Sequence, residues 1–100
     1  MADMAGQDTQ VATRIANLLS TLGGEMAESE RAEVDRFLSA GECGLALDTL
    51  SWILVDEQKP IGHGVLREID SLAEIMELRE ERFMHALHNA HEQQIARQGV

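Results

Sequence analysis

Three histidines recur at intervals of three residues near the end of the chain, in the run HALHNAHE. Imidazole nitrogens bind transition metals. Residues three or four apart lie on one face of a helix, so His88 could bind a metal together with His91 or with Glu92. His85 and His91 are six residues apart, which places them about 120° out of line on a helix. Two ligands on one helix also leave a zinc site incomplete. The pattern therefore favours solvent-exposed histidines over a metal centre, with His63 in a loop.

The other reactive groups form no pattern that is typical of an enzyme. Cys43, the only cysteine, has no base beside it and is expected to be packed at a helix start, and a packed cysteine is usually inert. The two glycines in TLGGEM lack the lysine of a phosphate-binding loop and are better explained as a helix stop. Paired carboxylates such as Glu80 with Glu81 indicate a solvated face in so acidic a chain. The sequence predicts no catalytic residue, no cofactor and no metal site.

The charge of the chain restricts its partners. Eighteen acidic residues against eight lysines and arginines give the 100 residues a net charge of −10. Repulsion from phosphate argues against nucleic acid and against an anionic membrane surface. A basic protein is the complementary partner, because opposite fields accelerate encounter, although acidity also serves solubility alone. The single cysteine, and the lack of a signal-type start or a long apolar run, lead us to expect a cytoplasmic protein.

Apolar residues recur at helical spacing along most of the chain, and no segment alternates as a strand does. Aromatic residues are scarce, so aliphatic side chains must fill the core, which favours helices over a sandwich. The sequence predicts an all-α fold, a small single-domain bundle of four to five helices with short loops over residues 9–97. Residues 1–8 are small and polar and are predicted to form a flexible N-terminus.

The predicted helices cover approximately residues 11–22, 28–40, 43–58, 65–76 and 79–97. Gly41 closes the second helix, and the run KPIGHG ends the third. The apolar period continues through MELREER, so the last two segments form either one long helix or two helices with a bend near Glu77 to Arg79, which we favour. The expected buried residues include Val11, Ile15, Leu18, Leu19, Leu22, Val34, Phe37, Leu38, Ala46, Leu47, Leu50, Ile53, Leu54, Leu66, Ile69, Leu72, Ala73, Met76, Phe83, Leu87, Ala90 and Ile95.

The least polar run, GECGLALDTLSWILVDEQKPI, carries a second stripe beside its core face. Trp52 lies about 140° from Leu47 on a helix, between Asp48 and Asp56, with Leu45 close by. A wide indole flanked by carboxylates is typical of an interface anchor with a charged rim. The alternative is that Trp52 packs under the last helix and that the two aspartates mark the edge of the buried zone.

A longer pattern surrounds this stripe: a helix that ends in FLSAGEC, then GLALDTL, then an acidic helix end before a Pro-Ile pair. It resembles the MafI family of bacterial immunity proteins, over about residues 11–87. Such proteins often have a glycine near the last helix junction, where this chain has Glu77. The positions that carry the resemblance are Phe37, Leu38, Ala40, Gly41, Glu42, Gly44, Leu45, Ala46, Leu47, Leu50, Ile53, Leu54 and Pro60.

The resemblance implies a small cytosolic antitoxin that binds a polymorphic toxin domain encoded beside it and blocks that toxin. Such toxins are commonly nucleases with basic clefts, which a chain of net charge −10 suits. We predict a partner-binding surface, here named the tryptophan patch, with Trp52 as its anchor. The alternative is a self-associating helical module with Leu45 and Trp52 at a two-fold interface, and the sequence does not distinguish a monomer from an oligomer. The tryptophan patch comprises Glu42, Leu45, Asp48, Trp52, Asp56 and Glu57.

Overall fold

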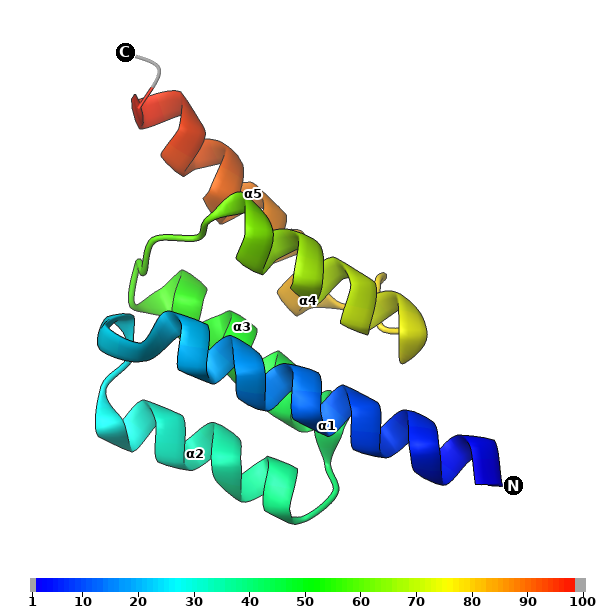
Figure 1. Cartoon of the computed structure of the whole chain (residues 1–100). Coiled ribbons are helices and arrows are strands. Elements are labelled where there is room, and N and C mark those ends of the chain that lie inside the picture. Colours follow the sequence, from blue (N-terminus) through cyan, green and yellow to red (C-terminus); the bar gives the residue numbers. More distant parts are fainter. Residues whose placement is uncertain (1, 99–100) are drawn as a thin grey trace. The chain divides into compact units, whose positions relative to one another are not determined.

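The computed structural model describes the backbone of residues 2–98 and the side chains of residues 9–98. Within this range the chain forms five α-helices and one 3-10 turn and contains no strand (Figure 1), which confirms the predicted all-α class. The elements are α1 (Ala2–Leu22), η1 (Gly23–Glu25), α2 (Glu28–Ser39), α3 (Cys43–Asp56), α4 (His63–Ile75) and α5 (Arg82–Gln98).

The chain divides into two compact units, the first ending at Thr49 and the second beginning at Leu50, so the boundary falls inside α3. In the first unit, α1 and α2 lie against each other and run in opposite directions (Figure 1). In the second unit, α4 and α5 do the same. The single domain expected over residues 9–97 stays a prediction.

Helix α1 begins earlier than the sequence pattern indicated. Its first residue is Ala2, so the backbone of residues 2–8 is helical, although the apolar period starts only at Val11. No proline or β-branched residue interrupts residues 2–8, and Gly6 is the one poor helix former among them, so their sequence is compatible with a helix. The side chains of these residues, and Met1 itself, lie outside the described part, and the flexibility expected there stays a prediction.

Helix α2 is fixed at both ends by local hydrogen bonds. At its start the Ala27 N–H donates to Glu30 Oε1 over 2.8 Å, which satisfies one of the amides that a helix start leaves free. At its end Gly41 takes a φ of 75°, as its glycine predicted. The Glu42 N–H then donates to Phe37 O over 2.9 Å, which closes a Schellman motif.

Helices α3 and α4 end in the same way, but without glycine. Gln58 has a φ of 52° and Glu77 a φ of 59°. The matching hydrogen bonds run from Lys59 N to Leu54 O over 3.0 Å and from Leu78 N to Ala73 O over 2.7 Å. The bend favoured near Glu77 to Arg79 is therefore confirmed: α4 ends at Ile75, and α5 is a separate helix.

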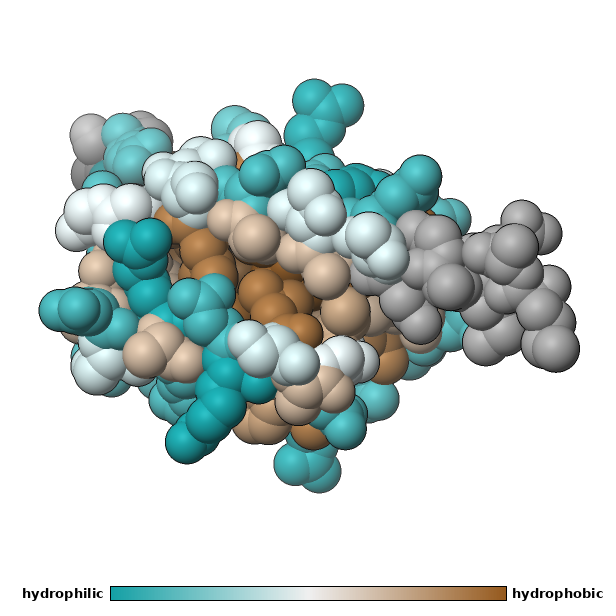
Figure 2. All heavy atoms as spheres, turned by 60° about the horizontal axis from the view of Figure 1, so that its bottom comes forward, coloured by the Kyte–Doolittle hydropathy of each residue, from teal (hydrophilic) through white to brown (hydrophobic). Residues whose placement is uncertain are grey.

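Most of the expected core residues are buried, and Ile15, Leu47, Leu50, Leu54, Ile69, Leu72 and Leu87 have no exposed area. Phe37, Leu38, Ile53, Met76 and Ala90 are only half-buried. Ile95 is 45% exposed, so its predicted inward position is wrong, because α5 extends beyond the part of its face that is covered. Hydrophilic side chains cover much of the face shown in Figure 2, with an apolar area between them.

The left-handed residue at the end of α4 makes a testable prediction. A residue with a side chain loses about 1–2 kcal/mol of folding free energy in the left-handed conformation. Glycine avoids this strain, but it loses about 0.5–1 kcal/mol more through its greater backbone entropy in the unfolded chain. We expect Glu77→Gly to raise the free energy of unfolding by about 0.5–1 kcal/mol in urea denaturation. The control is Glu80→Gly, an exposed turn residue without a positive φ, which should lower it. A loss of stability in Glu77→Gly would contradict this account of the helix end.

Candidate functional site

The tryptophan patch lies on α3 and at its two ends, as the sequence predicted for a continuous helix. Leu45 is 47% exposed, whereas Asp48 and Trp52 are half-buried. Glu42, Asp56 and Glu57 are exposed. The indole of Trp52 is therefore partly exposed to solvent. It lies on a different side of α3 from the fully buried leucines. Whether this patch contacts a partner stays a prediction.

The acidic residues of the tryptophan patch lie at opposite ends of α3, where the helix dipole has opposite effects on a negative charge. Glu42 precedes the helix, and its carbonyl accepts a bond from Ala46 N over 2.9 Å, so its carboxylate lies at the positive end of the helix dipole. Asp56 and Glu57 stand at the other end, where the last carbonyls already carry partial negative charge. α3 itself contains no lysine or arginine. The last turn of α3 is therefore acidic, and the nearest basic residue along the chain is Lys59, two residues after Glu57.

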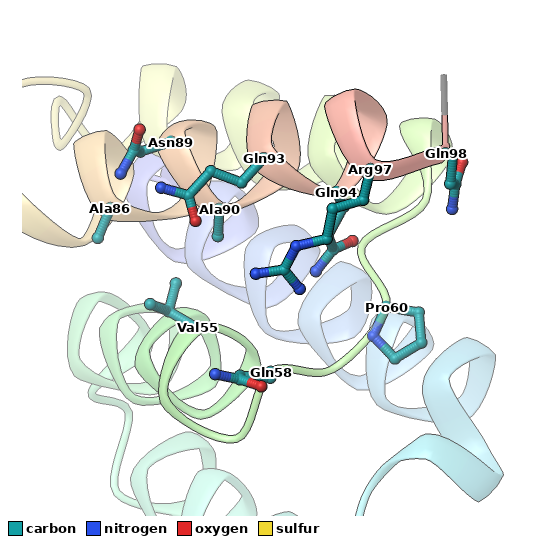
Figure 3. A pocket seen from close by; sticks show the side chains of 10 residues that line it. All are labelled: Val55, Gln58, Pro60, Ala86, Asn89, Ala90, Gln93, Gln94, Arg97 and Gln98. Carbon is teal, nitrogen blue, oxygen red and sulfur yellow. The ribbon is translucent and has the colours of Figure 1, made fainter. Parts of the chain in front are cut away.

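A groove of about 440 Å³ lies beside this end of α3, within the second unit. Figure 3 shows Val55 on α3 pointing toward α5, from which Gln93 and Arg97 extend. Among the described residues that line the groove, Arg97 carries the only formal charge, and amides supply most of the other polar groups. The lining residues are Val55, Gln58, Pro60, Ala86, Asn89, Ala90, Gln93, Gln94, Arg97 and Gln98.

The connection between α3 and α4 is held against α5 by side-chain hydrogen bonds to its backbone. Gln94 Oε1 accepts from Ile61 N over 2.9 Å, and Gln94 Nε2 donates to Lys59 O over 2.9 Å. His91 Nδ1 donates to Ile61 O over 2.9 Å. These bonds position Pro60 at the edge of the groove. The role of Gln94 could not be predicted from the sequence. Gln93 and Gln94 are identical in type, and only the position of the loop in the structure shows which of them bonds to it.

The histidines of α5 do not form a metal site together. His85 is exposed, and His88 Nε2 lies 2.7 Å from Asp70 Oδ1 of α4, with the two side chains 46% and 33% exposed. His91 is 7% exposed, so the expectation that it is solvated is wrong: its ring supplies the donor that the Ile61 carbonyl needs. Between residues 9 and 98, no group of three or more His, Cys, Asp or Glu side chains is placed to hold a metal ion.

Two other sequence expectations concern the helix starts. His63 is the first residue of α4 instead of a loop residue, and it is exposed. Cys43 is the first residue of α3 and is half-buried, at the helix start where the sequence placed it. No helix of the described chain combines the length and apolar character that crossing a bilayer requires. Comparisons with protein-family models, curated proteins and solved structures found no match to this chain.

The hydrogen bonds of Gln94 predict a difference between two adjacent glutamines. Gln94→Ala leaves a backbone N–H and a backbone carbonyl without their partners, and we expect it to lower the free energy of unfolding by about 1–3 kcal/mol. Gln93→Ala is the matched control, because Gln93 is exposed and should change stability by less than about 0.5 kcal/mol. Thermal or urea denaturation of the two variants measures the difference. Equal stabilities would show that the loop is not held by Gln94.

Proposed function

We propose that this chain is an inhibitor protein, without catalytic activity of its own, that binds a basic protein through the tryptophan patch. The resemblance to MafI immunity proteins makes a bacterial toxin domain the expected partner, and the cytoplasm the expected compartment. The observation that carries the proposal is the arrangement on α3: a half-buried indole with carboxylates on both sides, on a helix without a basic residue.

The end of α3 supports this choice of partner. Two exposed carboxylates, Asp56 and Glu57, adjoin the negative end of a helix dipole, which disfavours them by about 0.3–1 kcal/mol each. An arginine or lysine from a partner neutralises both the carboxylates and the helix end. Trp52 lies one helical turn before Asp56 and offers apolar area at low entropic cost, as anchors of protein interfaces do.

A nuclease domain fits this surface because its substrate cleft must be basic to hold phosphates. The net charge of −10 attracts such a domain over a long range, and the patch then supplies the specific contacts. Inhibition follows if the acids occupy the phosphate-binding positions, or if the chain covers a neighbouring surface and bars the substrate.

Self-association through α3 is the second candidate. It is favoured by the 47% exposure of Leu45, an apolar residue on the same helix as Trp52. Light scattering separates the two functions. The inhibitor should be a monomer that forms a heterodimer with the toxin domain, whereas the self-associating module should be a dimer by itself.

If Trp52 anchors the interface, its removal should weaken binding more than removal of an exposed residue outside the tryptophan patch. We expect Trp52→Ala to weaken binding of the toxin domain encoded by the neighbouring reading frame by about 2 kcal/mol, because the anchor of an interface carries much of its binding energy. Calorimetric titration measures the loss. Ile95→Ala is the control: this residue is 45% exposed but lies outside the tryptophan patch, so its removal should leave affinity unchanged. Equal losses from the two variants would remove Trp52 as the anchor.

If Asp56 and Glu57 attract the basic partner, reversal of their charge should change the rate at which the two proteins associate. Reversing Asp56 and Glu57 to lysine should slow association with the basic partner by about tenfold at low salt, and less at high salt, because steering depends on unscreened charge. The double reversal of Glu80 and Glu81 changes the net charge equally outside the patch, and serves as the control. Stopped-flow kinetics at two salt concentrations compares them. If both double variants associate at the same rate, net charge alone steers the encounter and the patch is wrongly placed.

A further inference from the structure

His91 is held in an unusual state for a buried histidine. Its Nδ1 lies 2.9 Å from the Ile61 carbonyl, and a carbonyl oxygen only accepts, so Nδ1 carries the proton. In the neutral form of this tautomer, Nε2 carries a lone pair. This atom is buried and has no hydrogen-bond partner among the described residues, in a side chain that is 7% exposed. Metal-binding histidines commonly donate a hydrogen bond from one ring nitrogen to a backbone carbonyl, which fixes the ring orientation and the tautomer while the other nitrogen binds the metal. Nδ1 of His91 makes such a bond.

The rings of His63 and His91 meet edge to face, at a spacing that a shared metal ion would allow. The two ring centroids are 4.8 Å apart, with the planes at 78°. A metal–nitrogen bond of about 2.0–2.1 Å places each centroid about 3.2 Å from the ion. Two such rings with centroids 4.8 Å apart subtend about 100° at the ion, between the square-planar and tetrahedral angles. The two imidazoles are thus spaced as neighbouring ligands.

The surroundings of the pair leave room for further ligands. Both rings line a pocket of about 180 Å³, formed by the loop before α4 and the last turns of α5. A water molecule occupies about 30 Å³, so the pocket admits an ion together with water ligands. Nε2 of His91 has almost no accessible surface in this conformation, so an ion reaches it only after a neighbouring side chain moves. His63 is exposed at the start of α4, and its ring is able to turn and open that path. The loop backbone is fixed by the bonds of Gln94, which limits movement of the site.

We propose that His63 and His91 form a binding site for a divalent transition-metal ion of the zinc or copper type. Neutral imidazoles without a thiolate or carboxylate suit these borderline ions and disfavour Mg²⁺ and Ca²⁺, which prefer oxygen ligands. Because the described chain supplies no group of three ligating His, Cys, Asp or Glu side chains, water occupies the remaining positions. The site lies outside the tryptophan patch and does not depend on the proposed inhibitor function.

The test is a titration of the untagged, full-length protein with Zn²⁺ in a non-chelating buffer. Calorimetry should give one ion per chain, and long-range ¹H–¹⁵N spectra should show ring nitrogens of both His63 and His91 shifting as Zn²⁺ is added. His63→Ala removes one ligand from an exposed position and should weaken binding by at least about tenfold. His85→Ala, another exposed histidine that does not line the pocket, is the matched control and should bind as the parent does.

Two outcomes would overturn the site. One is an unchanged His91 ring signal at saturating Zn²⁺, which needs no variant and is unaffected by any folding defect. The other is equal affinity in His63→Ala and the parent, which would place the bound ion elsewhere on the acidic surface. Circular dichroism of His63→Ala verifies that a lost affinity is not lost structure.

Discussion

The loop between α3 and α4 depends on three hydrogen bonds that two side chains of α5 make to its backbone. Gln94 bonds the Ile61 N–H and the Lys59 carbonyl, and His91 bonds the Ile61 carbonyl. A loop without regular structure would otherwise leave these groups to water, and it would be free to move. Its attachment places one wall of the groove beside α3 and brings His63 to His91. The groove and the His63–His91 pair therefore depend on the same few contacts.

Helix α3 has a fully buried apolar side and an acidic side that faces solvent. The helix buries Leu47, Leu50 and Leu54 completely, and its opposite side retains acids and an indole. Burial of this kind explains why the helix forms, but it does not require carboxylates at the carbonyl end of the helix. Under the proposed function, the basic partner offsets the cost of these carboxylates at the helix end. The groove beside it is lined mostly by amides and apolar groups, with Arg97 as the one formal charge among its described residues, so acidic and hydrogen-bonding groups lie on adjoining surfaces.

Apolar periodicity and the position of one glycine account for the features that could be predicted from the sequence. The helical class, the fully buried leucines and the left-handed end at Gly41 all derive from local patterns that need no partner segment. The ends at Gln58 and Glu77 could be inferred only in part, because neither residue prefers the left-handed region. The burial of His91 could not be inferred at all, since the carbonyl that it satisfies is thirty residues away in the chain. Ser51 shows the same limit: a polar residue on the core face of α3, it is fully buried although its type gives no such signal.

The way in which α3 and α4 end also restricts how the gene can vary. Each closing turn pairs a fixed amide with a fixed carbonyl five residues before it, Lys59 with Leu54 and Leu78 with Ala73. Replacement of the residue at the turn leaves this spacing intact, whereas the gain or loss of a single codon does not. One residue gained or lost inside either helix would move the residue at the closing turn by about 100° around the helix axis. Substitution at these two turns is therefore expected to disturb the helix ends less than a change in helix length.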